Sequence, residues 1–199
     1  DFYTFRLENF TTLPLTAQEI HDTGLREVAR IRAEMMDTIA RSDFDNKDNL
    51  VDEALFTAFV NYLRTDSRFY YTSADAMLRD YSHIAKDMDA VLPELFGKLP
   101  RLPYGIKPMP DYIAESAPTA YYYQGSVKNG VSGTFIVNTS QLKERPKYEM
   151  KALTYHESVP GHHLQIALSQ ELEDAGLHKW RELVGYTVFV EGWGLYSER

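Results

Sequence analysis

Apolar residues recur at three- and four-residue steps along most of the first half of the chain. Thr16 and Glu19 form a capping-box pattern, and an apolar series at helical spacing follows it, so a helix is predicted over about 16–41. The same spacing predicts two further helices, over about 48–65 and about 73–91. Residues 1–14 show no such spacing and are predicted to be an irregular or partly extended lead-in.

The pattern changes near residue 99, where several prolines interrupt any helix: Pro100, Pro103, Pro108 and Pro110. A short strand is predicted at 104–107, and two β-rich runs at 121–123 and 133–138 flank an Asn-Gly dipeptide, as in a hairpin. Helical spacing returns after Pro146, with further helices over about 162–175 and from near His178. This order predicts an α+β fold that is mostly α-helical, with a small antiparallel sheet.

We expect one domain over residues 1–199, with a helical part over about 1–98 and a sheet-containing part over about 99–199. The net charge of −8 argues against a nucleic-acid partner, which would need a basic face. The absence of cysteine excludes disulfides and thiolate metal ligands, and no apolar run is long enough to cross a bilayer. The chain starts at Asp1 rather than Met, and it stops at Arg199 with no Gly, Pro or polar tail to end the last segment, so we expect a fragment of a longer protein.

The chemistry of the chain is concentrated in the segment His-Glu-Ser-Val-Pro-Gly-His-His, residues 156–163. Three of the six histidines lie within these eight residues, next to Glu157, and such a cluster favours metal binding over isolated core histidines. In the zinc motif H-E-x-x-H, two histidines one helical turn apart bind the metal and the glutamate acts as general base. Here Pro160 stands where the second histidine should be, so we predict that the helix breaks around 158–160 and that Gly161 allows the turn.

Either His162 or His163 can then act as the second ligand beside His156. A bulge of two extra residues would put His162 in the position of the expected histidine. His163 would return to the face of His156 only on a continuous helix, and its Cα would lie about 10 Å further along the axis. Zinc–nitrogen bonds are about 2.0–2.1 Å long, so we favour His162.

A third ligand must come from another element, because a catalytic zinc site usually has three protein ligands and one open position. Glu191 is the best candidate, since a carboxylate in an apolar run is costly unless it is paired or bound to metal. A salt bridge on a helix surface is the alternative interpretation of Glu191. Glu198, seven residues further on, is the second choice of ligand.

The string H-E-S-V-P-G-H-H-L-Q, followed about thirty residues later by E-G-W-G-L-Y-S-E, closely resembles the bacterial family called domain of unknown function 885. Residues 15–21 and 133–138 resemble that family too, so the resemblance covers nearly the whole chain. The family is grouped with H-E-x-x-H zinc metallopeptidases of the carboxypeptidase Taq and oligopeptidase type, and many members are lipoproteins or secreted proteins. The resemblance therefore implies a zincin-like fold and a periplasmic, secreted or lipid-anchored location.

By this resemblance, Zn²⁺ is held by His156, His162 and Glu191, and Glu157 activates water in a metallopeptidase that cleaves a peptide substrate. His163, Tyr196 or one of the tyrosines at 121–123 could stabilise the transition state. By analogy with related peptidases, the strand at 134–138 is expected at the edge of the sheet, paired with the substrate backbone. The alternatives are a zinc hydrolase of a non-peptide amide or ester, and a non-catalytic binding module with a vestigial site.

Overall fold

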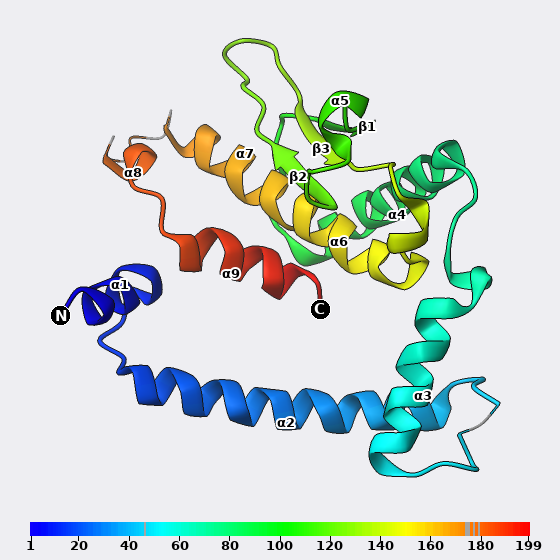
Figure 1. The fold of residues 1–199 in the computed structure, drawn as a ribbon. Helices are drawn as coiled ribbons and strands as arrows, with labels where there is room; N and C mark the ends of the chain where they lie inside the picture. The colour runs from blue at the N-terminus through cyan, green and yellow to red at the C-terminus, as the bar shows by residue number, and fades with distance from the viewer. Residues whose placement is uncertain (46, 174–175, 177, 179) are drawn as a thin grey trace. The chain divides into compact units, whose positions relative to one another are not determined.

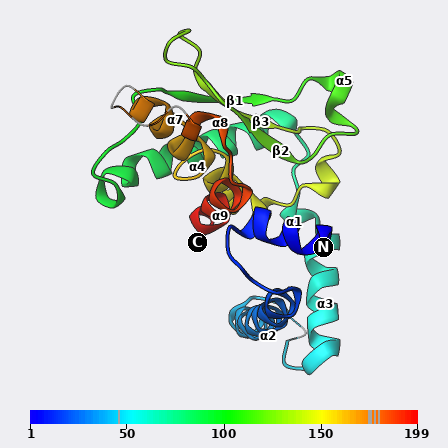
Figure 2. The same ribbon diagram turned by 90° about the vertical axis from the view of Figure 1, so that its left-hand side faces the viewer.

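The computed structural model describes residues 1–45, 47–173, 176, 178 and 180–199 (Figures 1 and 2). The chain divides into two compact units, residues 1–69 and residues 70–199. Each unit has its own buried apolar cluster. The helix at 74–95 belongs to the second unit and shares its core with the sheet.

The first unit consists of helices α1 (Phe2–Thr11), α2 (Ala17–Arg41) and α3 (Asp52–Thr65), followed by a 3-10 turn at Ser67–Phe69. The capping box at Thr16 and Glu19 is present at the start of α2, as predicted. Ile39, Phe44 and Phe59 form the small core between α2 and α3.

The prediction of an irregular lead-in over residues 1–14 was wrong, because α1 is helical. Its first turn is capped by Asp1, whose carboxylate accepts a hydrogen bond from the Thr4 backbone N–H at 2.9 Å. None of the residues of α1 is buried, so no apolar stripe marks this helix in the sequence.

The second unit contains a three-stranded sheet of β1 (Tyr104–Pro108), β2 (Ala120–Tyr123) and β3 (Gly133–Val137), in the order β1-β3-β2. The predicted hairpin is correct, since β2 and β3 are antiparallel. The prediction of a purely antiparallel sheet was wrong, because β1 pairs with β3 in parallel. The long connection from β1 to β3 returns the chain to the starting end of the sheet and makes this pairing possible. The expectation that residues 134–138 form an edge strand was also wrong, because β3 is the central strand.

The helices of this unit are α4 (Ala74–Leu95), α5 (Asp111–Ala114), α6 (Met150–Glu157), α7 (His162–Glu173), α8 (Trp180–Leu183) and α9 (Thr187–Ser197), with 3-10 turns at Leu142–Glu144 and Lys147–Glu149. The predicted α+β class, with helix dominant, is confirmed. The predicted last helix does not run on from near His178. It starts at Trp180, stops at Leu183 and is followed by the separate helix α9.

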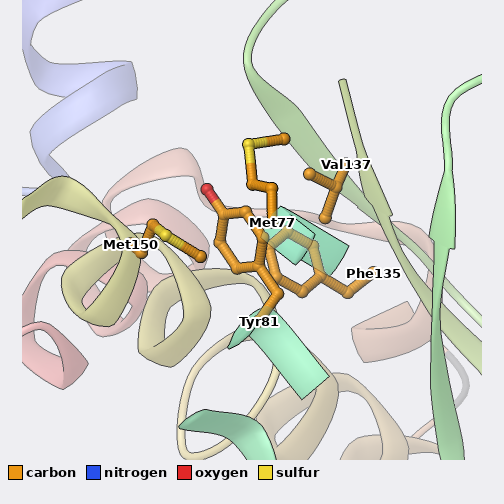
Figure 3. Packing of buried hydrophobic residues seen from close by; sticks show 5 residues of the cluster. All are labelled: Met77, Tyr81, Phe135, Val137 and Met150. Carbon is orange, nitrogen blue, oxygen red and sulfur yellow. The ribbon is translucent and has the colours of Figure 1, made fainter. Parts of the chain in front are cut away.

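The main core holds the helix α6 in place against α4 and the sheet. Met77 and Tyr81 come from α4, Phe135 and Val137 from β3, and Met150 from α6 (Figure 3). The rings of Tyr81 and Phe135 meet edge to face, with centroids 5.4 Å apart and planes at 90°. Because α6 carries His156 and Glu157 at its C-terminal end, this packing fixes where the pair lies relative to β2 and β3.

The last helix, α9, packs against both α6 and α7 (Figure 1). This contact brings the segment at 187–198 to the break between α6 and α7, although the two segments are far apart in the sequence. Within the described part of the chain, we find no helix that is both long and apolar enough to cross a membrane.

Candidate metal centre

The helix with His156 ends at Glu157, as the position of Pro160 predicts. Its last turn closes with hydrogen bonds from the Ser158 N–H to the Thr154 carbonyl and from the Gly161 N–H to the Tyr155 carbonyl, both at 2.9 Å. The peptide bond between Val159 and Pro160 is cis, and α7 starts at His162. The break therefore places His156 on α6 and His162 on α7.

Glycine is required at position 161 for space rather than for a left-handed backbone. A Cβ atom there would lie 1.9 Å from the His156 carbonyl oxygen and 2.3 Å from that of Tyr155. The indole N–H of Trp193 donates to the Pro160 carbonyl at 2.8 Å, which ties α9 to the same turn. The close approach of these segments fixes the directions in which His156 and His162 point.

His156, His162 and Glu191 converge on one point. Among the described residues, they form the one group of three whose ligand atoms all lie within 4.8 Å of one another. The Oε2 atom of Glu191 lies 3.5 Å from Nε2 of His156 and 3.7 Å from Nε2 of His162. The two imidazole rings are nearly perpendicular, at 89°, with centroids 4.6 Å apart.

These separations fit a tetrahedral zinc ion better than they fit direct hydrogen bonds. A hydrogen bond from nitrogen to oxygen is about 2.7–3.2 Å long, so both distances are too long. Ligand atoms about 2.0–2.1 Å from zinc at tetrahedral angles lie about 3.3 Å apart, close to the separations found here. Two imidazoles and one carboxylate also form a donor set that catalytic zinc sites use.

The imidazole of His162 gives a second indication that the residues fit a metal. His162 is buried, and its Nδ1 atom has no hydrogen-bond partner among the described residues, which a metal on Nε2 would not change. Its Nε2 atom faces Glu191 beyond hydrogen-bonding distance. Burial, and then the nearby His156, lower the pKa of His162, so the neutral ring that a metal requires is favoured.

Glu198, the second choice of ligand, instead orients His156. Its Oε1 atom lies 2.8 Å from His156 Nδ1, so the carboxylate accepts a hydrogen bond from the Nδ1–H group. The lone pair of Nε2 is then directed at His162 and Glu191. Metal-binding histidines usually donate their other ring N–H to such an acceptor. Glu191, Gly194 and Glu198 follow helical spacing on one face of α9, and this face meets His156.

Gly194 provides the space that the His156 ring occupies between the two carboxylates. A Cβ atom at position 194 would lie 2.7 Å from Cε1 and 2.8 Å from Nε2 of His156. We expect Gly194→Ala to displace this ring, weaken zinc binding and lower the free energy of unfolding by about 1–3 kcal/mol. Zinc titration and thermal unfolding measure both effects.

The matched control is Gly192→Ala in the same helix, where an added Cβ would meet nothing within 4 Å. Alanine is the better helix former, so this variant should be as stable as the original chain or more stable by up to about 1 kcal/mol. Equal zinc affinity and stability in the two variants would show that the packing of Gly194 on His156 is unimportant.

Glu157 lies next to the group and is itself largely buried, with 8 % of its surface exposed. Burial raises the pKa of its carboxyl group, and the negative charge of Glu191 adds to this effect. The charge of His156 and the backbone N–H of Tyr122 act in the opposite direction. A carboxylate with a raised pKa beside a metal centre is suited to accept a proton near neutral pH.

His163 and Tyr196 lie outside the group of three. His163 is completely buried and both of its ring nitrogens are used, since Nε2 lies 2.9 Å from the Leu102 carbonyl oxygen and Nδ1 lies 2.9 Å from the Tyr122 hydroxyl. Burial lowers the pKa of His163 to about 4, so the ring is neutral. Tyr196 is 71 % exposed and packs beside Trp193.

The contacts of Glu198 with His156 and of Tyr122 with His163 were not predicted from the sequence. Glu198 follows Glu191 by two helical turns, and this spacing alone indicates that both reach the same neighbour. Tyr122 has no such signal, because it is one of three consecutive tyrosines and only the fold decides which of them meets His163.

The fold and this group of side chains define a mostly helical α+β protein with a candidate metal centre at a broken helix. The chain belongs to the family described as "Bacterial protein of unknown function (DUF885)", whose model matches residues 1–199. No curated protein matches the chain.

A solved structure with a similar fold is that of a protein from Colwellia psychrerythraea, named there as a "putative lipoprotein". It superposes with a TM-score of 0.86 and is 29 % identical in sequence, and the match covers 99 % of this chain. The match covers 33 % of the Colwellia chain, so the present chain spans about a third of that protein's length.

Proposed function

We propose that the protein is a zinc-dependent hydrolase, and specifically a metallopeptidase that cleaves peptide bonds. The observation that carries this proposal is the convergence of His156, His162 and Glu191 within 4.8 Å, directly beside the buried carboxyl group of Glu157. The resemblance of the H-E-x-x-P-G-H-H string to the zinc metallopeptidases supports the choice of a peptide as substrate.

In this proposal, His156 and His162 would hold Zn²⁺ through their Nε2 atoms, and Glu191 would hold it through its carboxylate. The ion supplies Lewis-acid activation of a water molecule and of the carbonyl group under attack. Glu157 accepts a proton from the water and passes it to the leaving amine. Glu198 holds the Nδ1 proton of His156, which keeps the ring in the tautomer that a metal needs.

The exposure of the third ligand supports a catalytic site rather than a structural one. The side chain of Glu191 is 58 % exposed, whereas those of His156 and His162 are 18 % and 10 % exposed. A structural zinc site is closed by four protein ligands and needs no adjacent base. Here the described residues offer three ligands, one open side and Glu157.

The expected location is also a proposal. We infer that the protein acts outside the cytoplasm, in the periplasm or secreted or attached by a lipid. The support is the name "putative lipoprotein" of the Colwellia protein, together with the expectation that many members of the family are lipoproteins or secreted proteins.

Metal-dependent hydrolysis is the test of this function. We expect about one equivalent of zinc per chain by elemental analysis, cleavage of members of a peptide library, loss of cleavage with a chelator, and its return on adding zinc. Esters and non-peptide amides, assayed in parallel, would reveal another zinc hydrolase. Bound zinc without hydrolysis of any of these substrates would instead point to a non-catalytic binding module.

A further inference from the structure

The side chain of His163 joins the first turn of α7 to the sheet at two points. The Leu102 carbonyl can only accept a hydrogen bond, so the proton of His163 is on Nε2. Nδ1 therefore accepts from the Tyr122 hydroxyl at 2.9 Å. The two hydrogen bonds therefore run without conflict from Tyr122 through His163 to Leu102.

Two tyrosine rings also pack against the imidazole ring of His163. The centroid of His163 lies 4.7 Å from that of Tyr104 on β1 and 5.6 Å from that of Tyr122 on β2. The ring of His163 is buried and both of its nitrogens are hydrogen-bonded. It is therefore held in one orientation. The hydrogen bond to this ring therefore also fixes the position of Tyr122 on β2.

Tyr122 also meets the proposed general base through its backbone. β2 packs against α6, the helix that ends at Glu157, and the Tyr122 N–H is directed at the Glu157 carboxylate. β2 is an edge strand of the sheet, so nothing on its outer side within the sheet holds it in place. Besides its pairing with Phe135 on β3, residue 122 is anchored by the side-chain contact with His163.

We propose that Tyr122 and His163 are positioning residues that set the place of Glu157 relative to His156, His162 and Glu191. His163 follows the ligand His162 directly in the chain, so one turn of helix supplies a metal ligand and the support for the base. Tyr122 transmits this placement, with its hydroxyl on His163 and its backbone N–H on Glu157. The inference rests on the proposed function for its kinetic consequences, but the contacts can be tested without it.

The direct test is Tyr122→Phe in the full-length protein, because this change removes the hydroxyl and keeps the ring and the backbone N–H. We expect kcat to fall by about 10- to 100-fold, as is typical when a supporting hydrogen bond around a metal site is lost. KM and zinc content should stay unchanged, since neither a ligand nor a substrate contact is removed. Hydrogen exchange of the amides at 120–123 should become faster.

The matched control is Tyr112→Phe, which removes a hydroxyl from a tyrosine on α5 that is 88 % exposed. It should leave kcat and amide exchange unchanged. At the other end, His163→Leu should reproduce the loss, and His163→Gln should restore part of the activity, because an amide can donate to Leu102 and accept from Tyr122. In a Glu157→Gln background, Tyr122→Phe should have no further effect on the remaining rate.

The results separate this inference from the proposed function. An active protein in which Tyr122→Phe retains full kcat and unchanged exchange at 120–123 would refute the positioning role. A protein that hydrolyses nothing would refute the proposed function, and the exchange of residues 120–123 in Tyr122→Phe against Tyr112→Phe would still decide whether the hydroxyl of Tyr122 anchors β2.

Discussion

Glu157→Gln is expected to lower kcat for peptide hydrolysis by about 10²- to 10⁴-fold, the range in which general base catalysis contributes. Glutamine has nearly the same shape as glutamate but cannot accept the proton of the attacking water. The carboxyl group of Glu157 is not one of the converging ligand atoms, so the zinc content should stay at about one equivalent. Steady-state kinetics and elemental analysis on the same preparation measure both quantities.

A suitable control for this substitution is Glu149→Gln, which removes the same charge just before the start of the same helix, α6. Glu149 is exposed and lies seven residues before His156, so its loss should change kcat by less than about twofold. If Glu157→Gln kept full activity with zinc bound, the assignment of Glu157 as the base would be wrong. If it lost zinc as well as activity, Glu157 would be needed for metal binding.

The break in the helix could be predicted from the sequence because its cause is local. Pro160 lacks a backbone N–H and cannot continue the hydrogen bonding from His156, whatever surrounds it. The capping box at Thr16 and the hairpin around Gly130 are local signals of the same kind, and both are present in the structure. These features depend on a few neighbouring residues, and the fold does not alter them.

The features that were missed depend on residues far apart in the chain or on the absence of a pattern. The direction of β1 is set by its long connection to β3, which no local spacing reveals. Helix α1 buries no side chain, so it has no apolar period that could predict it.

The convergence of the candidate ligands also depended on packing that the sequence does not display. The apolar run around Glu191 indicated that its carboxylate needs a partner, but did not identify one. In the structure, Gly194 lets α9 approach His156 closely. Glu191 then lies on one side of the His156 ring and Glu198 on the other. The contact between α6 and α9 therefore decides that Glu191 is the proposed ligand and that Glu198 is the acceptor for His156.

The second large effect is expected from the two adjacent histidines, which the structure places in different surroundings. His162→Ala should weaken zinc binding by more than about 100-fold, since even the loss of a residue that only supports a ligand costs about 10- to 100-fold. Hydrolysis should disappear with the metal. His163→Gln should keep about one equivalent of zinc, because both nitrogens of His163 are bonded to Leu102 and Tyr122 rather than directed at Glu191.

The measurement is zinc content after dialysis, together with the zinc Kd from competition with a chelator. His83→Ala is the control for removal of an imidazole, because the side chain of His83 is 78 % exposed on α4 and should not affect zinc. Loss of zinc in His163→Gln, with zinc retained in His162→Ala, would reverse the assignment of the second ligand. Such a result would require the turn at 158–161 to rearrange when metal binds, because the present turn directs His162 and not His163 at Glu191.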